Sequence, residues 1–128
     1  MATVLLYNLR DTDKRMKLKL CLYRLGLKCL DVAPEDFGHP VGYLLGLKGY
    51  GPGKTEESFE DEMLVMHDLS RQQFSALLDK LRQEHVPVAL KAVVTETNAA
   101  WSSSRLHREL AAEHAAMRAK TGSVHRRK

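Results

Sequence analysis

Two stretches of six residues decide the fold of this chain: VLLYNL at residues 4–9 and LVMHDL at residues 64–69. Each is a nearly continuous apolar run of the kind that forms a buried strand, and each is followed by residues that can cap a helix. A second strand pattern follows each helix. Because the two stretches lie about sixty residues apart, the chain resembles two similar β-α-β units in one sequence.

The spacing of the apolar residues predicts the other elements outward from these two stretches. The predicted order is a strand at 3–9, a helix at 14–25, a strand at 27–33, a short helix at 34–47, a loop at 48–61, a strand at 62–69, a helix beginning after Ser70, a strand at 87–95 and a last helix beginning at 102–104.

This alternation favours the α/β class, as one domain with a four-stranded, mostly parallel sheet and helices on both faces. The nearly all-apolar strands at 3–9 and 62–69 are expected at the centre of the sheet, and the alternating strands at 27–33 and 87–95 at its edges. The alternative is a ferredoxin-like α+β sandwich with an antiparallel sheet, in which residues 34–61 decorate the connection between the second and third strands.

The charge is unevenly distributed along the chain. The length of 128 residues and the 44% hydrophobic content suit one packed domain, which we expect at residues 1–119. The formal net charge is +4, yet residues 1–117 carry 15 basic and 16 acidic groups. The basicity therefore lies at the C-terminus, and residues 120–128 are predicted to be a basic, disordered tail.

Neither a membrane segment nor a metal site is predicted. No apolar run approaches the roughly 18 residues of a membrane span, and the N-terminus has no basic leader, so we expect a soluble, cytoplasmic protein. Cys21 and Cys29 lie in different predicted elements and outside any CxxC pattern, which favours free thiols. His107 and His114 are two helical turns apart, which does not suit chelation of one ion. We expect no metal and no cofactor.

The predicted helix at 14–25 has two apolar faces with basic residues between them. Met16, Leu20 and Tyr23 lie on one side, and Leu18, Cys21, Leu22 and Leu25 lie on the other. One face is expected on the sheet and the other on a further element or a second subunit, as in a homodimer. The basic residues, together with the tail, leave open a weak nucleic-acid-binding function.

The glycine-rich run GYGPGKT at residues 49–55 ends like a phosphate-binding loop. Lys48 stands where that loop requires its first glycine, and a helix-like segment precedes the run where a strand is needed. The acidic residues at 56–62 that follow would repel a triphosphate. We therefore interpret residues 49–55 as a flexible turn and the acidic run as a solvated surface.

Polar residues near the ends of the predicted strands form the candidate ligand site. Its residues are Asn8, His67, Asp68, Lys91, Thr95, Asn98 and Trp101. In a parallel sheet the strand ends share one edge, where these groups would meet. The alternative is structural: the asparagines and Asp68 form turns and caps, Lys91 faces solvent on an edge strand, and Trp101 anchors the last helix. No nucleophile is placed beside a histidine, so no catalytic residue is assigned.

The segment 37–53 is the candidate surface for a protein partner. Glycines flank its apolar residues, which suits an adaptable surface. The residues assigned to this surface are Phe37, Val41, Tyr43 and Leu44.

Several stretches together resemble a small bacterial family known as domain of unknown function 3783. They are LLYNL (5–9), EDFGHPVGYLLGL (35–47), FEDEMLVMHDLS (59–70) and VALKAVVTETNAAW (88–101), followed by a helix of the pattern L-x-x-E-L-x-x-E-H. The resemblance covers roughly residues 4–117 and implies a bacterial, cytoplasmic protein. It implies no activity and transfers no catalytic residue.

These observations favour a non-enzymatic binding or regulatory module for a protein partner or a small ligand. Two alternatives stay open. One is a small metabolite-binding enzyme or sensor that uses the strand-end polar cluster. The other is a nucleic-acid binder that uses the basic helix and the tail.

Overall fold

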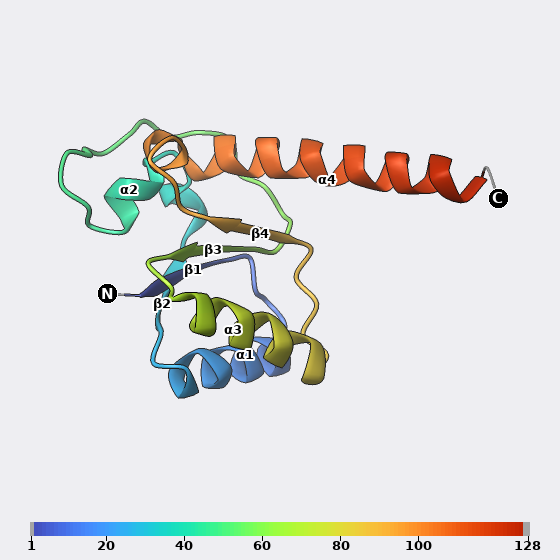
Figure 1. The fold of residues 1–128 in the computed structure, drawn as a ribbon. Helices are drawn as coiled ribbons and strands as arrows, with labels where there is room; N and C mark the ends of the chain where they lie inside the picture. The colour runs from blue at the N-terminus through green and yellow to red at the C-terminus, as the bar shows by residue number, and fades with distance from the viewer. Residues whose placement is uncertain (1, 127–128) are drawn as a thin grey trace.

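The computed structural model describes residues 2–126 and shows a four-stranded sheet with helices on both faces (Figure 1). Along the chain the elements are β1 (Thr3–Tyr7), α1 (Thr12–Arg24), β2 (Lys28–Val32), the 3₁₀ turn η1 (Pro34–Asp36), α2 (Val41–Leu44), β3 (Met63–His67), α3 (Arg71–Gln83), β4 (Leu90–Val93), the 3₁₀ turn η2 (Asn98–Ala100) and α4 (Ser103–Arg126). Within residues 2–126, no helix combines the length and hydrophobicity needed to cross a membrane.

The strands form one sheet in the order β2-β1-β3-β4. β1 pairs with β2 in parallel, β3 pairs with β4 in parallel, and the two central strands pair antiparallel. The prediction of an α/β domain with a mostly parallel sheet, and with β1 and β3 at its centre, is confirmed. The antiparallel sheet of the ferredoxin-like alternative is not formed, because each crossover helix returns the chain beside the strand that it left.

The two β-α-β units share the same order of elements and the same helix caps. β1 and β3 pair around Leu5 and Val65, so that the first strand of each unit lies against that of the other. α1 and α3 both have 13 residues. Asp11 and Ser70 cap them, each accepting a hydrogen bond from the backbone N–H three residues further on. The echo between residues 4–9 and 64–69 is therefore a structural repeat.

Both helices also end in the same way. A residue in the left-handed conformation follows each helix, Gly26 with φ 74° in the first unit and His85 with φ 56° in the second. The N–H groups of Leu27 and Val86 then return to carbonyls in the last helical turn, both at 2.9 Å. This Schellman-type ending turns the chain back toward the sheet.

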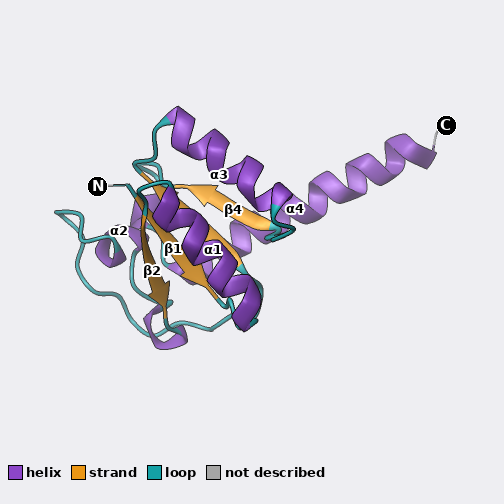
Figure 2. Cartoon of the chain, turned by 90° about the horizontal axis from the view of Figure 1, so that it is seen from below, coloured by secondary structure: helices purple, strands orange, loops and turns teal. Residues whose placement is uncertain are grey.

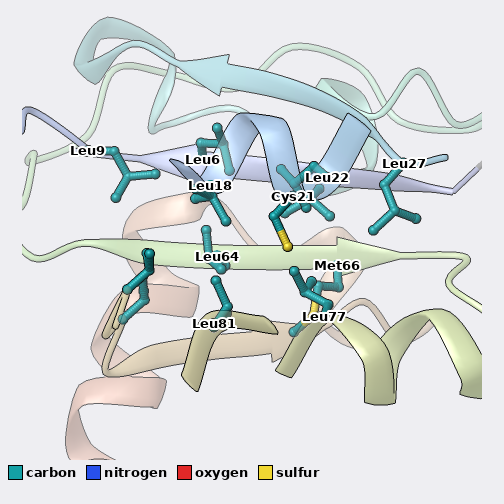
Figure 3. Packing of buried hydrophobic residues seen from close by; sticks show 13 residues of the cluster. Leu6, Leu9, Leu18, Cys21, Leu22, Leu27, Leu64, Met66, Leu77 and Leu81 are labelled. Atoms are coloured by element: carbon teal, nitrogen blue, oxygen red, sulfur yellow. The ribbon is translucent and has the colours of Figure 1, made fainter. Parts of the chain in front are cut away.

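An aliphatic core fills the space between the sheet and the layer of α1 and α3 (Figure 3). Leu64 lies at its centre and is fully buried, as are Leu18 of α1 and Leu77 of α3. The opposite face of α1 is open, with Met16 64% and Tyr23 81% exposed. The sheet-facing side of the predicted two-faced helix is thus confirmed, and a partner for the outer side stays a prediction.

An aromatic core fills the other face, between the sheet and α4. The rings of Tyr7, Phe37 and Phe59 contact one another, and those of Phe37 and Phe59 are stacked with their centroids 4.4 Å apart. The hydroxyl of Tyr7 lies 2.7 Å from that of Ser103, which fixes the start of α4 on the sheet. Burial raises the pKa of Tyr7 above its ordinary value, so the phenol stays a neutral hydrogen-bonding group.

The segment between β2 and β3 differs from the sequence prediction in two ways. The helix expected at 34–47 is reduced to η1 and the single turn α2, since Pro40 disfavours a helix before it and lacks a backbone N–H. Phe37 and Val41 were expected on a partner surface but are completely buried in the aromatic core. Only Tyr43, 39% exposed, and the half-buried Leu44 remain near the surface.

The glycine-rich loop packs closely on this segment. A side chain at Gly38 would collide with the backbone of Lys54, and a side chain at Gly53 would collide with the backbone of Gly38. The Gly53 N–H donates to Nδ1 of His39 at 3.0 Å, and the Ser102 hydroxyl donates to the Glu56 carboxylate at 2.7 Å. Of the three glycines of GYGPGKT, Gly53 therefore serves loop packing, whereas a side chain at Gly49 or Gly51 would meet no atom within 4 Å.

The backbone of α4 continues to Arg126, into the region predicted to be a disordered tail from residue 120. Residues 127–128 lie outside the described residues. The disorder of the tail stays a prediction.

Candidate binding groove beside β4

A groove of about 620 Å³ lies between the second half of α3 and β4. Its lining residues are Leu78, Leu81, Arg82, His85, Val86, Pro87, Val88 and Lys91. Most are apolar, and the basic groups lie among them. Figure 2 shows β4 at the side of the sheet that is away from β2, with α3 on the near face.

The groove has a local cause in the chain. In the first unit β2 begins at Lys28, directly after the turn residue Leu27. In the second unit the equivalent turn residue is Val86, and β4 begins only at Leu90. The intervening residues 87–89 have no counterpart in the first unit. This longer connection separates the end of α3 from β4 and supplies one wall of the groove.

The side chains that face the two edge strands differ in kind between the units. In the first unit Arg15 and Lys19 of α1 bind Asp31 of β2, at 2.5 and 3.1 Å. α3 begins 59 residues after α1, at Arg71 against Thr12, so Phe74 and Leu78 stand where Arg15 and Lys19 stand. The sheet register places Val93 opposite Met66, as Asp31 lies opposite Leu6.

The consequence is an apolar, open flank on the second unit. Phe74 and Leu78 are half-buried, and Val93 is 49% exposed. At the matching positions of the first unit, Arg15 and Lys19 of α1 form ion pairs with Asp31 of β2, and we call these pairs the Asp31 clamp.

Lys91 is the predicted site residue that lies in the groove. Its ammonium group donates to the backbone carbonyl of Val88, which folds the side chain back over the residues that wall the groove. Partial burial lowers the pKa of Lys91 below its ordinary value. Arg82, the other cation of the lining, pairs with Asp79 on the same helix. The groove thus combines an apolar floor with positive charge.

The opposite face of β4, toward α4, is hollowed as well. A depression of about 450 Å³ and a smaller one of about 200 Å³ lie there, and both are lined by Ala89, Leu90 and His114. α4 continues past this side of the sheet (Figure 1). β4 is therefore an edge strand with recesses on both of its faces.

The structure divides the predicted strand-end cluster. β1 runs antiparallel to β3. Asn8, after the last residue of β1, and His67, the last residue of β3, therefore lie at opposite ends of the strands. The Asn8 amide donates to the carbonyls of Phe59 and Asp61, both at 2.9 Å, and so holds the loop that leads into β3. The expected convergence of Asn8 with the other polar groups is wrong.

Because β3 and β4 are parallel, the residues that follow them lie at the same end of the sheet: His67, Asp68, Thr95 and Asn98. Asp68 adopts φ 63° in the turn after β3, as Asn8 does after β1 with φ 61°. Thr95 and Asn98 bond to each other across the turn that follows β4. These contacts are those of turn residues, and a ligand-binding role for them stays a prediction.

Trp101 anchors the start of α4 to the rest of the domain. Its carbonyl accepts the Val41 N–H at 2.8 Å, and the Arg105 guanidinium lies 4.5 Å from the centre of its ring. The indole is packed against the aromatic core. These contacts describe an anchor, and ligand stacking on Trp101 stays a prediction.

The basic residues of α1 are largely engaged in ion pairs. Arg15 and Lys19 form the Asp31 clamp, and Lys14 pairs with Glu62. This reduces the charge that α1 can offer to a nucleic acid. Cys21 and Cys29 are both free thiols.

Sequence comparison locates a family resemblance over the same region. Residues 62–117 match the model of a family described as Domain of unknown function (DUF3783). The predicted resemblance is confirmed over this segment, which runs from β3 into α4 and contains every residue that lines the α3–β4 groove. Residues 4–61, also expected to belong to the resemblance, lie outside the match. No curated protein and no solved structure matches the chain.

Sequence reasoning placed Lys91 at a site but missed its surroundings. Leu78 and Leu81 were identified only as apolar positions of a helix. The available signal was the length of the connection after that helix, where Pro87, Val88 and Ala89 separate the turn from the strand. A comparison of the two repeats position by position would have exposed this difference.

Proposed function

We propose that this protein is a non-enzymatic binding module, and that its ligand lies in the α3–β4 groove. The observation that carries the proposal is the apolar groove with basic residues beside the edge strand β4, next to the flank that the Asp31 clamp closes in the first unit. Pockets of this size with an apolar lining and a few polar groups are typical ligand sites. A bacterial origin and a cytoplasmic location belong to the same proposal and rest on the family resemblance.

The groove suits a ligand with an apolar body and an anionic group. Leu78, Leu81 and Val88 offer apolar contact, while the Lys91 ammonium group, which donates to the Val88 carbonyl, supplies positive charge in the lining. The separation of Asn8 from His67 argues against a metabolite-converting centre built from the strand-end cluster. Binding therefore accounts for the groove better than the alternative functions.

The test uses the dye anilinonaphthalene sulfonate, an apolar anion, with the full chain. We expect saturable fluorescence enhancement, and we expect Leu78→Glu to weaken dye binding at least about tenfold, because a carboxylate would enter an apolar wall. Lys91→Met should weaken binding about threefold through loss of the charge. Leu20→Glu, on the exposed face of α1, is the matched control and should leave binding unchanged.

Each variant is first checked for a cooperative thermal transition, so that dye bound to a partly unfolded chain is recognised. Equal dye affinity for the native protein and the folded Leu78→Glu variant would remove the groove as the ligand site.

A further inference from the structure

The outer edge of β4, meaning the backbone of residues 89–93 that faces away from β3, lies between the recesses on the two faces of the strand. We propose that this edge binds an extended peptide segment of another protein as a fifth strand, and that the segment alternates apolar side chains with an acidic one. This inference rests on the proposed function and names the class of ligand that the groove accepts.

The hydrogen-bond register decides which backbone groups are available. The Val94 N–H donates to the Met66 carbonyl at 2.9 Å, across the β3–β4 pairing. Backbone groups alternate in direction along a strand, so Leu90 and Ala92 also turn toward β3, whereas Lys91 and Val93 turn outward. The outward groups are a row of donors and acceptors suited to one more strand.

Asn98 shows how a peptide group fits this edge. Its amide nitrogen donates to the Val93 carbonyl at 3.0 Å, and its amide oxygen accepts from the Thr95 N–H at 2.8 Å. A neighbouring strand would make the same pair of bonds, to one residue's carbonyl and the N–H two residues on. Asn98 therefore closes the edge from the Val93 carbonyl onward, and the length on which a peptide can pair runs from residue 89 to the Val93 N–H.

The two recesses receive the side chains of such a peptide. Successive side chains of a strand point to opposite faces of the sheet. Those on one face would enter the groove of about 620 Å³ beside Leu78, and those on the other would enter the depressions beneath α4, beside Leu90 and His114. In this mode of recognition the main chain gives affinity, and pockets for alternate side chains give specificity.

Charge selects the side chain that enters the α3–β4 groove, whereas the larger depression beneath α4 carries both signs of charge, with Asp61, Glu62 and Arg118 in its lining. The charged side chains that line the α3–β4 groove are Arg82 and Lys91, with His85 as a further base. In a dimer formed through two antiparallel copies of β4 centred on Lys91, Lys91 would lie opposite Lys91 of the other copy, and like charges opposite each other are unfavourable. An acidic residue on a different chain removes this conflict.

The test begins with a phage-displayed library of random heptapeptides, selected on the full-length protein. The strongest binder is then synthesised in three forms: unmodified, and N-methylated at alternate amides in each of the two possible phases. One phase blocks the amides that pair with β4, and the other blocks only those facing solvent. We expect the first to weaken binding at least about tenfold and the second to change it less than about threefold.

Protein variants give the complementary readout. Val93→Pro removes an outward N–H at an edge position where proline is tolerated, and it should weaken the unmodified peptide about tenfold relative to Val93→Ala. Lys91→Met should weaken it severalfold and flatten its salt dependence. Both peptide phases behaving alike, or no peptide being selected, would overturn the inference.

The dye experiment distinguishes failure of the groove as a ligand site from failure of peptide binding at the β4 edge. Dye binding that depends on Leu78, without any selected peptide, means that the groove takes small molecules, so the proposed function stands and the inference fails. Loss of both means that the groove is not a binding site. A concentration-dependent dimer in sedimentation velocity that Val93→Pro abolishes would assign the edge to a second copy, which also overturns the inference.

Discussion

The two β-α-β units have the same order of elements but differ at their edge strands. The helix of the first unit is bound to its edge strand by ion pairs, and the helix of the second unit is not. In the first unit α1 grips β2 through the Asp31 clamp, with Arg15 Nη1 and Nη2 at 2.6 and 2.5 Å from the two carboxylate oxygens. In the second unit Phe74, Leu78 and Val93 stand at the matching positions, and the longer connection at 87–89 holds the strand away from the helix. A few side chains and three residues of loop therefore close the edge strand of the first unit and leave that of the second unit open.

The shared core should make the two units unfold together. Leu64→Ala, in the second unit, should lower the free energy of unfolding by about 3 kcal/mol, because a buried leucine is replaced by a cavity. Urea titration followed by circular dichroism measures the loss, and Leu20→Ala on the exposed face of α1 is the control.

Hydrogen exchange sharpens that experiment. Since Leu64 belongs to the core that residues of both α1 and α3 share, amides of β2 and β4 should lose protection to the same degree. Protection kept in β2 and lost in β4 would show that the units are independent.

Transferring the ionic clamp should abolish the difference in binding. Leu78→Lys combined with Val93→Asp copies the charges of Lys19 and Asp31 onto the second unit. We expect dye affinity to fall at least about tenfold, equal to about 1.4 kcal/mol, because position 78 in the apolar wall of the groove becomes charged. Fluorescence titration checks this, with Lys19→Leu and Asp31→Val as the reciprocal change in the first unit.

The position after each helix offers a smaller, reciprocal test. His85→Gly should raise the free energy of unfolding by about 0.5–1 kcal/mol, because a left-handed conformation strains a residue with a side chain. Gly26→Ala should lower it by about 1 kcal/mol for the same reason. Both are read from urea midpoints, and no gain on His85→Gly would mean that the histidine makes a compensating contact.

The sequence predicts the strands and main helices because their apolar runs and caps are local signals, as with Asp11 and Ser70. It does not predict the direction of β3 relative to β1, since both are all-apolar central strands whose pattern fits either pairing. The antiparallel pairing of β1 and β3 places Asn8 and His67 at opposite ends of the strands. The groove was missed for a related reason: Leu78 reads as core in a helical pattern, and only packing in three dimensions leaves it half-buried.

The Asp31 clamp gives the smallest effect and a pH dependence of defined sign. Hydrogen bonding from Arg15 holds the pKa of the Asp31 carboxyl below its ordinary value. A carboxyl with a lower pKa in the folded state stabilises the fold above its unfolded pKa of about 3.9, and that stabilisation is lost as the pH falls through the folded value. Because the Asp31 side chain is 43% exposed, solvent screening limits its contribution to about 0.5 kcal/mol.

Asp31→Asn should therefore be less stable than the native chain by about 0.5 kcal/mol at neutral pH, and the gap should narrow as the pH falls below the unfolded pKa of about 3.9. Urea unfolding across this range measures it. Asp79→Asn is the control in the second unit, because Asp79 pairs with Arg82 inside one helix and ties no strand to it. A gap that persists unchanged in acid would mean that Asp31 acts through packing, and the contrast between a charged edge and an apolar one would then lose its electrostatic basis.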